Sequence, residues 1–244
     1  MTYLLSEMEV LNRKYNWAKE NARRKSVKVF VFRHGHTSFN EKHKFCGWKN
    51  SRLTKNGLID AKKISRKLRS EKIDLAFHSS LSRSRRTMEI VVGFHKECHK
   101  KICDDRLIER CYGDLQGKTH SAYAKECGEN DLKKYLQWHK SQYLDYNHSK
   151  EFVRKFGERD LLKIRRSYSA RPPNGESIKD VEKRVNEFLK DLLKICKLYK
   201  VNVALSVHGN SMRPIRKYFE NLSTKEMMHL ENPWDKAFVY EVKV

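Results

Sequence analysis

Several features that would indicate other classes of protein are missing from this 244-residue chain. Its six cysteines form no Cys-x-x-Cys pair and no short secreted framework, so neither a zinc site nor a disulfide scaffold is indicated. The first residues hold no apolar signal segment, and no run reaches the roughly 18 apolar residues that a membrane span requires. Internal repeats and low-complexity tracts are absent as well. We therefore expect a cytoplasmic globular protein in a reducing compartment.

Acidic residues are few beside the basic ones. The chain has 30 Asp and Glu against 53 Lys and Arg, a formal net charge of +23. This excess favours anionic partners, and a cationic cleft would concentrate phosphorylated substrates. The basic residues are spread from Lys14 to Lys243, and no recognisable nucleic-acid motif accompanies them. We expect a small phosphorylated substrate, and neither a membrane nor nucleic acid as the main partner.

Strand-like and helix-like segments alternate along most of the chain. Short β-branched and aromatic runs predict strands, and apolar residues spaced three and four apart predict helices. The strands are expected at 27–32, 74–77, 201–207 and 237–244, an extended piece at 102–111, and helices at 54–70, 82–94, 178–198 and 211–221. The alternation predicts an α/β fold: a three-layer α/β/α sandwich with a mostly parallel central sheet, a helical lid insertion, and ligand sites at the C-terminal ends of strands.

Two segments depart from this alternation. Residues 1–26 have a loose helical period and are interpreted as an N-terminal helical extension before a catalytic domain at 27–244. Residues 118–168 contain two helical stretches separated by Asp145-Tyr146-Asn147-His148. We interpret this second segment as an insertion that caps the site.

An apolar strand ends in His-Gly at two places in the sequence. These are Arg33-His34-Gly35 and His208-Gly209-Asn210, each followed by a polar loop that opens a helix. Glycine allows the backbone to approach a ligand closely, and a helix N-terminus offers N–H groups to an anion. One histidine at a strand end is more often structural than catalytic. Two in the same context, one beside Arg33, indicate a phosphate site that includes His34.

Arginines and one glutamate complete this candidate chemistry. The run 79–87 places Arg83 and Arg86 where a strand passes into a helix, and a guanidinium there can bind phosphate oxygens in a bidentate manner. A solvated basic helix surface is the alternative, and it is the one we favour for Arg85. Glu109 could exchange the proton that phosphoryl transfer to or from an alkoxide requires. A surface ion pair with a nearby arginine would explain Glu109 equally well.

Seven motifs in a fixed order resemble the histidine phosphatase superfamily, and within it the 2,3-bisphosphoglycerate-dependent phosphoglycerate mutases. The resemblance covers residues 27–117 and 158–244. Its motifs are Arg33-His34-Gly35 with Asn40, Phe45-Cys46-Gly47-Trp48, Leu53-Thr54 with Gly57, the run 79–87, Glu109-Arg110 with Tyr112-Gly113, Arg165-Arg166-Ser167-Tyr168, and His208-Gly209-Asn210-Ser211 with Arg213.

The resemblance implies an enzyme that works through a phosphohistidine. The residue matching His34 is phosphorylated, the residue matching Glu109 is the proton donor, and those matching Arg33, Arg83 and His208 surround the phosphoryl group. A mutase of this family uses 2,3-bisphosphoglycerate as a primer and no metal. The residues that the resemblance places in the substrate pocket are Asn40, Cys46, Gly47, Arg86, Arg110, Tyr112, Arg165, Arg166, Gly209 and Asn210.

These roles agree with the chemistry of phosphoryl transfer. The transferring group carries charge on three equatorial oxygens, so two arginines and a histidine can stabilise it without a metal. His34 must be neutral to attack, and the like charges of Arg33 and Arg83 are expected to lower its pKa.

The chain also departs from the mutase pattern. His36 replaces a usual glutamate, Cys46 a usual serine or threonine, and His120 a lysine that helps bind substrate. The stretch 112–165 is longer than in the family, and the stretch after Pro172-Pro173 is shorter, as in the simpler phosphatases.

Three functions therefore stay open from sequence. A phosphoglycerate mutase comes first, because Arg86, Arg110 and the pair Arg165-Arg166 would hold the substrate's carboxylate as well as its phosphate. A phosphatase, which admits water, is the alternative favoured by the altered lid. A non-catalytic module that binds a polyanion is the remote third, and a homodimer is left open.

Overall fold

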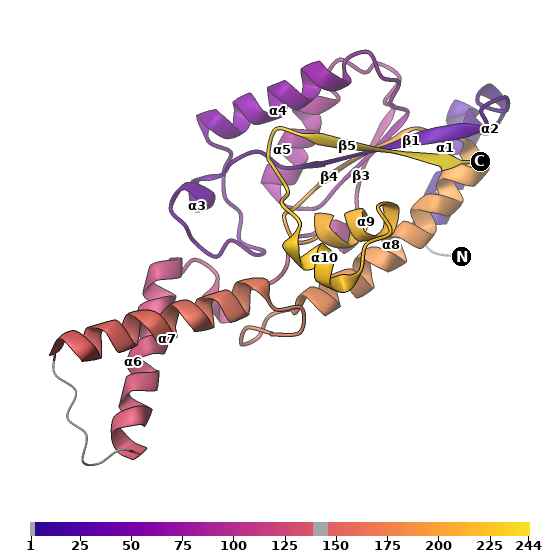
Figure 1. Ribbon diagram of the computed structural model, residues 1–244. Helices are drawn as coiled ribbons and strands as arrows, with labels where there is room; N and C mark the ends of the chain where they lie inside the picture. The colour runs from indigo at the N-terminus through magenta and orange to yellow at the C-terminus, as the bar shows by residue number, and fades with distance from the viewer. Residues whose placement is uncertain (1–2, 139–145) are drawn as a thin grey trace.

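A five-stranded sheet lies between two layers of helices in the computed structural model, which describes residues 3–138 and 146–244 (Figure 1). The strand order is β3-β2-β4-β1-β5, with parallel pairing throughout except that β5 runs antiparallel to β1. The α/β fold with a mostly parallel sheet is thus confirmed. The strands are β1 (Ser26–Arg33), β2 (Leu75–His78), β3 (Lys100–Cys103), β4 (Val203–Val207) and β5 (Ala237–Lys243).

Both faces of the sheet are buried, because successive side chains of a strand point to opposite faces. On β1, Val29 and Val31 belong to one core, whereas Phe30 and Phe32 belong to the other. The valine side packs against α1 (Tyr3–Tyr15), α8 (Ile178–Tyr199) and α9 (Met212–Phe219). The phenylalanine side packs against α4 (Lys55–Leu68) and α5 (Ser82–Val91). Strands buried on both faces explain the continuous apolar runs in the sequence.

Most expected helices are present, and their first residues explain where they begin. Thr54 caps α4 by accepting a hydrogen bond from the Gly57 N–H, and Ser177 with Asp180 forms a capping box at the start of α8. Strand β3 overlaps only the first residues of the extended piece expected at 102–111. The other short elements are α2 (Trp17–Glu20) within the expected N-terminal extension, and α3 (Ser38–Glu41), α10 (Thr224–His229) and the 3-10 turns Asp105–Leu107 and Gly113–Leu115, which were not expected.

The N-terminal segment is helical, as expected, and it is also part of the core. Leu4, Met8 and Leu11 of α1 and Trp17 of α2 are all buried in the cluster that contains β1 and α8. Burying an apolar side chain of this size contributes about 1.5–3 kcal/mol. The segment therefore stabilises the sheet layer that it covers, while the division at residue 26 stays a prediction.

Helices α6 (His120–Trp138) and α7 (Tyr146–Arg166) form a hairpin that extends away from the sheet (Figure 1). They pack backbone to backbone, since a Cβ atom on Gly128 would lie 2.0 Å from the Val153 carbonyl oxygen. The expected separator 145–148 is wrong in part: Asp145 lies outside the described residues, but 146–148 form the first turn of α7.

The base of the hairpin contributes residues to the cavity described below, and its role as a lid stays a prediction. Within residues 3–138 and 146–244, no helix has both the length and the apolar composition needed to span a membrane.

Candidate active site

Parallel pairing of β1 with β4 brings the two His-Gly segments together. Arg33 pairs with Val207 in the sheet register, and the His34 N–H donates to the Val207 carbonyl at 3.0 Å. His34 and His208 consequently lie side by side, with ring centroids 4.9 Å apart. Strand β2 pairs with the other edge of β4, and Ser79, just beyond its end, has its Oγ 2.7 Å from His208 Nε2. The candidate site thus forms where three neighbouring strands end.

His34 is held as a neutral imidazole with one nitrogen available for chemistry. Its Nδ1 lies 2.8 Å from the Gly35 carbonyl oxygen and donates to it, which leaves the lone pair on Nε2. Arg83 Nε donates to that Nε2 at 3.2 Å. Burial, followed by the charges of Arg83 and Arg33, holds the pKa of His34 well below its usual 6.5. Nε2 therefore carries the free lone pair of His34, and the expected effect of the two arginines on its pKa is secondary to burial.

Arg83 is almost completely buried at the start of α5, where the run after β2 enters the helix. Its other two guanidinium nitrogens donate to the carbonyls of Gly47 at 2.7 Å and Lys49 at 3.0 Å. Three directed hydrogen bonds fix this charge beside His34, and a lysine could not reproduce them.

Two buried donors of the site, Arg33 Nε and His208 Nδ1, have no partner within residues 3–138 and 146–244. Ser79 lies against the other nitrogen of His208, so a Ser79 hydroxyl that donates to Nε2 leaves Nδ1–H as a donor. Burial lowers the pKa of Arg33 to about 10, which keeps the guanidinium charged at neutral pH. An unpaired buried donor costs roughly 1–3 kcal/mol. A bound anion would satisfy both.

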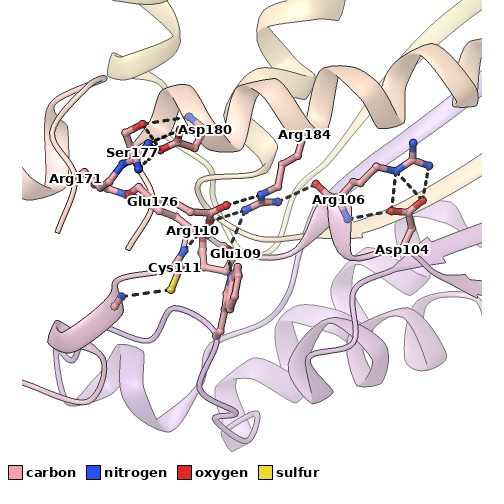
Figure 2. Close-up of polar contacts among 12 residues, drawn as sticks. Asp104, Arg106, Glu109, Arg110, Cys111, Arg171, Glu176, Ser177, Asp180 and Arg184 are labelled. Carbon is pink, nitrogen blue, oxygen red and sulfur yellow. Dashed lines mark hydrogen bonds and ion pairs between the residues drawn. The ribbon is translucent and has the colours of Figure 1, made fainter. Parts of the chain in front are cut away.

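Glu109 lies next to the two histidines. Its Oε1 accepts hydrogen bonds from the backbone N–H groups of Arg110 at 2.9 Å and Asn210 at 3.1 Å. Arg184 of α8 donates to the Glu109 carbonyl oxygen at 3.1 Å and forms an ion pair with Glu176 at 3.0 Å (Figure 2). The carboxylate is therefore positioned by the backbone around it, and its own carbonyl is held by Arg184 of a half-buried ion pair.

Among the described residues, His34, Glu109 and His208 form the one group whose ligand atoms lie close enough for a metal ion, within 4.8 Å of one another. Two histidines and a carboxylate are common metal ligands. Here, however, a cationic nitrogen of Arg83 donates to His34 Nε2, and Arg33 adds a second guanidinium. These charges favour an anion at this position over a cation. The expectation that no metal is required stays a prediction.

A cavity of about 580 Å³ opens at the ends of these strands. His34, Arg83 and His208 do not line it and are 2%, 1% and 0% exposed, so they lie at greater depth than its walls. Ten of the predicted site residues line it, namely Arg33, Asn40, Cys46, Gly47, Glu109, Tyr112, Arg165, Arg166, Gly209 and Asn210.

Two predicted substrate residues, Arg86 and Arg110, are not brought into the cavity. On α5 the side chains of Arg83 and Thr87 are buried, whereas Arg86 is exposed and pairs with Glu89 at 3.1 Å. The helix period turns Arg86 toward solvent, as it turns Arg85.

Arg110 is fully buried, and its guanidinium donates at 2.7 Å to the carbonyls of Glu176, Ile164 and Ala170. All three of its nitrogens are engaged with backbone. It therefore fixes the end of α7, where Arg165 and Arg166 follow, and its side chain does not line the cavity.

The rim of the cavity comes from the hairpin. Arg165 and Arg166 end α7, and His120 begins α6 with its ring 4.6 Å from that of Phe45. Burial, then the charges of Arg165 and His43, lower the pKa of His120 to about 4. His120 is therefore neutral at physiological pH, unlike the lysine expected there from the resemblance. Burial also raises the pKa of Cys46 in the same wall.

Sequence reasoning missed the segment 231–236, which contributes Asn232 and Trp234 to the cavity. Trp234 lies between Arg33 and His36: the Arg33 Cζ is 4.1 Å from its ring centroid, and the His36 ring stacks on it at 3.7 Å. The segment is irregular, so no hydrophobic period marks it. The only signal was a large aromatic residue directly after Pro233.

Known proteins are similar to this chain in sequence and in fold. A sequence profile described as "Histidine phosphatase superfamily (branch 1)" matches residues 29–159 and 144–244. The chain belongs to the histidine phosphatase superfamily. A 2,3-bisphosphoglycerate-dependent phosphoglycerate mutase of Methanococcus vannielii is 33% identical over 215 residues, 88% of this chain and 89% of that protein. A phosphoglycerate mutase of Schizosaccharomyces pombe is 30% identical over 88% and 89%.

Solved structures of the superfamily share the fold. YhfR of Bacillus stearothermophilus has a TM-score of 0.65 at 20% identity, covering 87% of this chain and 90% of YhfR. A structure from Escherichia coli described as a putative α-ribazole-5'-P phosphatase has a TM-score of 0.64 at 16% identity, covering 89% and 95%. At these identities the likeness shows the fold alone, which hosts more than one activity.

Proposed function

We propose that this histidine phosphatase superfamily member is a phosphoglycerate mutase, which interconverts 3-phosphoglycerate and 2-phosphoglycerate through a phosphohistidine on His34 and is primed by 2,3-bisphosphoglycerate. The observation that carries the proposal is a cavity with cations at both ends. Arg33 meets the buried histidines at its inner end, and Arg165 and Arg166 stand at its rim. Such a cavity suits a small substrate that carries a phosphate and a second anionic group. The mutase relatives support it.

The inner residues suit the transfer step. His34 Nε2 attacks phosphorus and forms an N–P bond, and the bond from phosphorus to the departing alkoxide oxygen breaks. Glu109 donates a proton to that oxygen, since its carboxyl group lies among the same histidines. Arg33 Nε and His208 Nδ1 donate to the equatorial oxygens, for which the protein offers them no other partner among the described residues. Each group acts on the charge that develops at phosphorus.

In the other half of the reaction the phosphoryl group on His34 passes to the free hydroxyl of a bound monophosphoglycerate and forms 2,3-bisphosphoglycerate, whose other phosphoryl group then returns to His34 and leaves the isomeric monophosphate. The N–P bond breaks, an O–P bond forms, and the proton of the attacking hydroxyl passes to Glu109. For this the intermediate must stay in the cavity. Arg165 and Arg166 can hold the carboxylate of the bound acid during the exchange, because both side chains line the rim.

A phosphatase of a small phosphorylated metabolite is the second candidate, favoured by one observation. His120 replaces the lysine expected at the rim and is neutral, so one charge that would retain a second anionic group is missing. Weaker retention allows water to take the phosphoryl group. We do not propose the polyanion-binding module, because the catalytic set is complete. A cytoplasmic setting is part of the proposal, and the six cysteines are free thiols.

One assay separates the two activities. The enzyme is incubated with 3-phosphoglycerate, with and without a trace of 2,3-bisphosphoglycerate, and 2-phosphoglycerate and inorganic phosphate are measured separately. A mutase forms 2-phosphoglycerate, faster with the primer, and releases little phosphate. Release of phosphate without 2-phosphoglycerate would overturn the mutase and leave the phosphatase.

A further inference from the structure

The guanidinium of Arg33 is held by one hydrogen bond and by stacking on an aromatic ring. Its Nε has no partner among the described residues, and NH1 donates at 3.2 Å to the Asn232 carbonyl oxygen. The Trp234 ring covers one face with its centroid 4.1 Å from Cζ. Near the guanidinium lies Gly209, where an added Cβ would come within 3.3 Å of the same Cζ. Arg33 therefore depends on stacking to keep its orientation.

Burial makes this support necessary. Burial is the largest cause that lowers the pKa of Arg33, and the charges of Arg83 and Arg213 lower it further, whereas the charge of Glu109 raises it. A long flexible side chain that has lost its hydration would otherwise move toward solvent. The negative face of an indole ring attracts a guanidinium and opposes that movement.

Trp234 is itself supported by the His36 ring. The His36 ring stacks on it at 3.7 Å with an interplanar angle of 27°, and His36 Nδ1 lies 2.7 Å from the buried Asp60 Oδ2 on α4. Asn232, two residues earlier, donates to the Gly209 carbonyl at 2.8 Å and accepts from Arg216 at 3.1 Å. The indole therefore lies against a His36 ring that is anchored to α4, and the segment that carries it is tied through Asn232 to α9 and to the loop after β4.

We propose that Trp234 is a positioning residue, backed by His36 and Asp60, that holds the Arg33 guanidinium in the plane from which Nε reaches a phosphoryl oxygen. The inference rests on the proposed role of Arg33 in binding the phosphoryl group. It also gives a function to His36, which replaces the glutamate usual in the family.

The test measures binding of inorganic orthovanadate, a mimic of the phosphoryl group in transfer, to the full-length protein by titration calorimetry. We expect Trp234→Ala to weaken binding about tenfold, as loss of a desolvated cation–π contact implies. Trp234→Phe, which keeps an aromatic face, is expected to recover most of the affinity. In steady-state assays Trp234→Ala is expected to lower kcat more than it raises KM for the phosphorylated substrate.

A double-mutant cycle separates positioning from a general structural role. If Trp234 acts through Arg33, Trp234→Ala changes orthovanadate affinity less than twofold in an Arg33→Ala background. The matched control is Phe94→Ala, which removes an exposed ring stacked 5.2 Å from the Arg69 guanidinium on the far end of α4 and leaves binding unchanged.

Each outcome of these measurements either supports or overturns the positioning role of Trp234. Equal affinity of the wild type and Trp234→Ala, or the same loss with and without Arg33, overturns the positioning role while the phosphate site stands. Failure of the wild type to bind orthovanadate overturns the phosphate site, and with it this inference. If Trp234→Ala does not fold, the comparison uses Trp234→Phe and Trp234→Leu. Leucine is a large side chain without a π face, and we expect Trp234→Leu to bind orthovanadate about tenfold more weakly than the wild type.

Discussion

The inner end and the rim of the cavity are built in different ways. Inside, His34, His208 and Ser79 follow three adjacent parallel strands, and the sheet register alone brings them together. At the rim, Arg165 and His120 come from the two ends of a helical hairpin that projects from the body (Figure 1). The sheet therefore brings the inner side chains together, and the hairpin supplies side chains at the rim.

Burial follows the same division. The inner side chains are almost fully buried and hydrogen-bonded to one another, whereas Arg165 and Arg166 are exposed. Groups that contact the phosphoryl group in transfer should act on kcat, and groups that hold the rest of the substrate should act on KM.

Replacing the nucleophile tests the inner end most severely. His34→Ala is expected to lower activity by at least about ten-thousandfold, because no other group can form the covalent intermediate. Incubation with labelled 2,3-bisphosphoglycerate should give acid-labile, base-stable label on the wild type and none on the variant. His229→Ala, on the exposed face of α10, serves as the control and should label normally. Label retained by His34→Ala would mean that another residue is the nucleophile.

Arg83→Lys tests whether geometry or charge matters at the inner end. The lysine keeps the charge but cannot donate at once to His34, Gly47 and Lys49. We expect kcat to fall about 100- to 1,000-fold with a small change in KM. The control is Arg85→Lys, on the exposed side of the same helix. A loss below tenfold would show that charge alone suffices.

Arg165→Ala tests the rim. We expect KM for 3-phosphoglycerate to rise about tenfold, the value of one charge-assisted hydrogen bond near solvent, while kcat changes less than twofold. Hydrolysis of a simple aryl phosphate without a carboxylate should not change. Arg159→Ala, further out on α7, is the matched control. A fall in kcat at constant KM would place Arg165 with the inner group and remove the distinction.

The same division explains what the sequence could predict. His34 and His208 were found because each ends a run of strand residues, a local pattern that parallel pairing turns into proximity. Arg110 was assigned to the substrate pocket by the resemblance. Its actual partners could not be found from sequence, because the three carbonyls that accept from it lie more than 50 residues away along the chain. Trp234 was missed because an irregular segment has no period that shows which way a side chain points.

The smallest effect concerns the protonation of His120 at the rim. Its pKa is about 4 in the folded protein and 6.5 ordinarily, so between these values the unfolded chain binds a proton that the folded chain does not. The free energy of unfolding therefore falls as pH drops from 6.5 toward 4. His120 is only half-buried, and we expect its share of the loss between pH 7 and pH 5 to be about 1 kcal/mol after screening.

His34 and His208 add losses of the same sign, but they do so equally in any variant at position 120. Urea unfolding of the wild type and His120→Gln at both pH values isolates the rim, with His229→Gln as the control. An identical pH dependence in wild type and His120→Gln would show that the rim imidazole is as solvated as an exposed one, and that the hairpin base is more open than the structure shows.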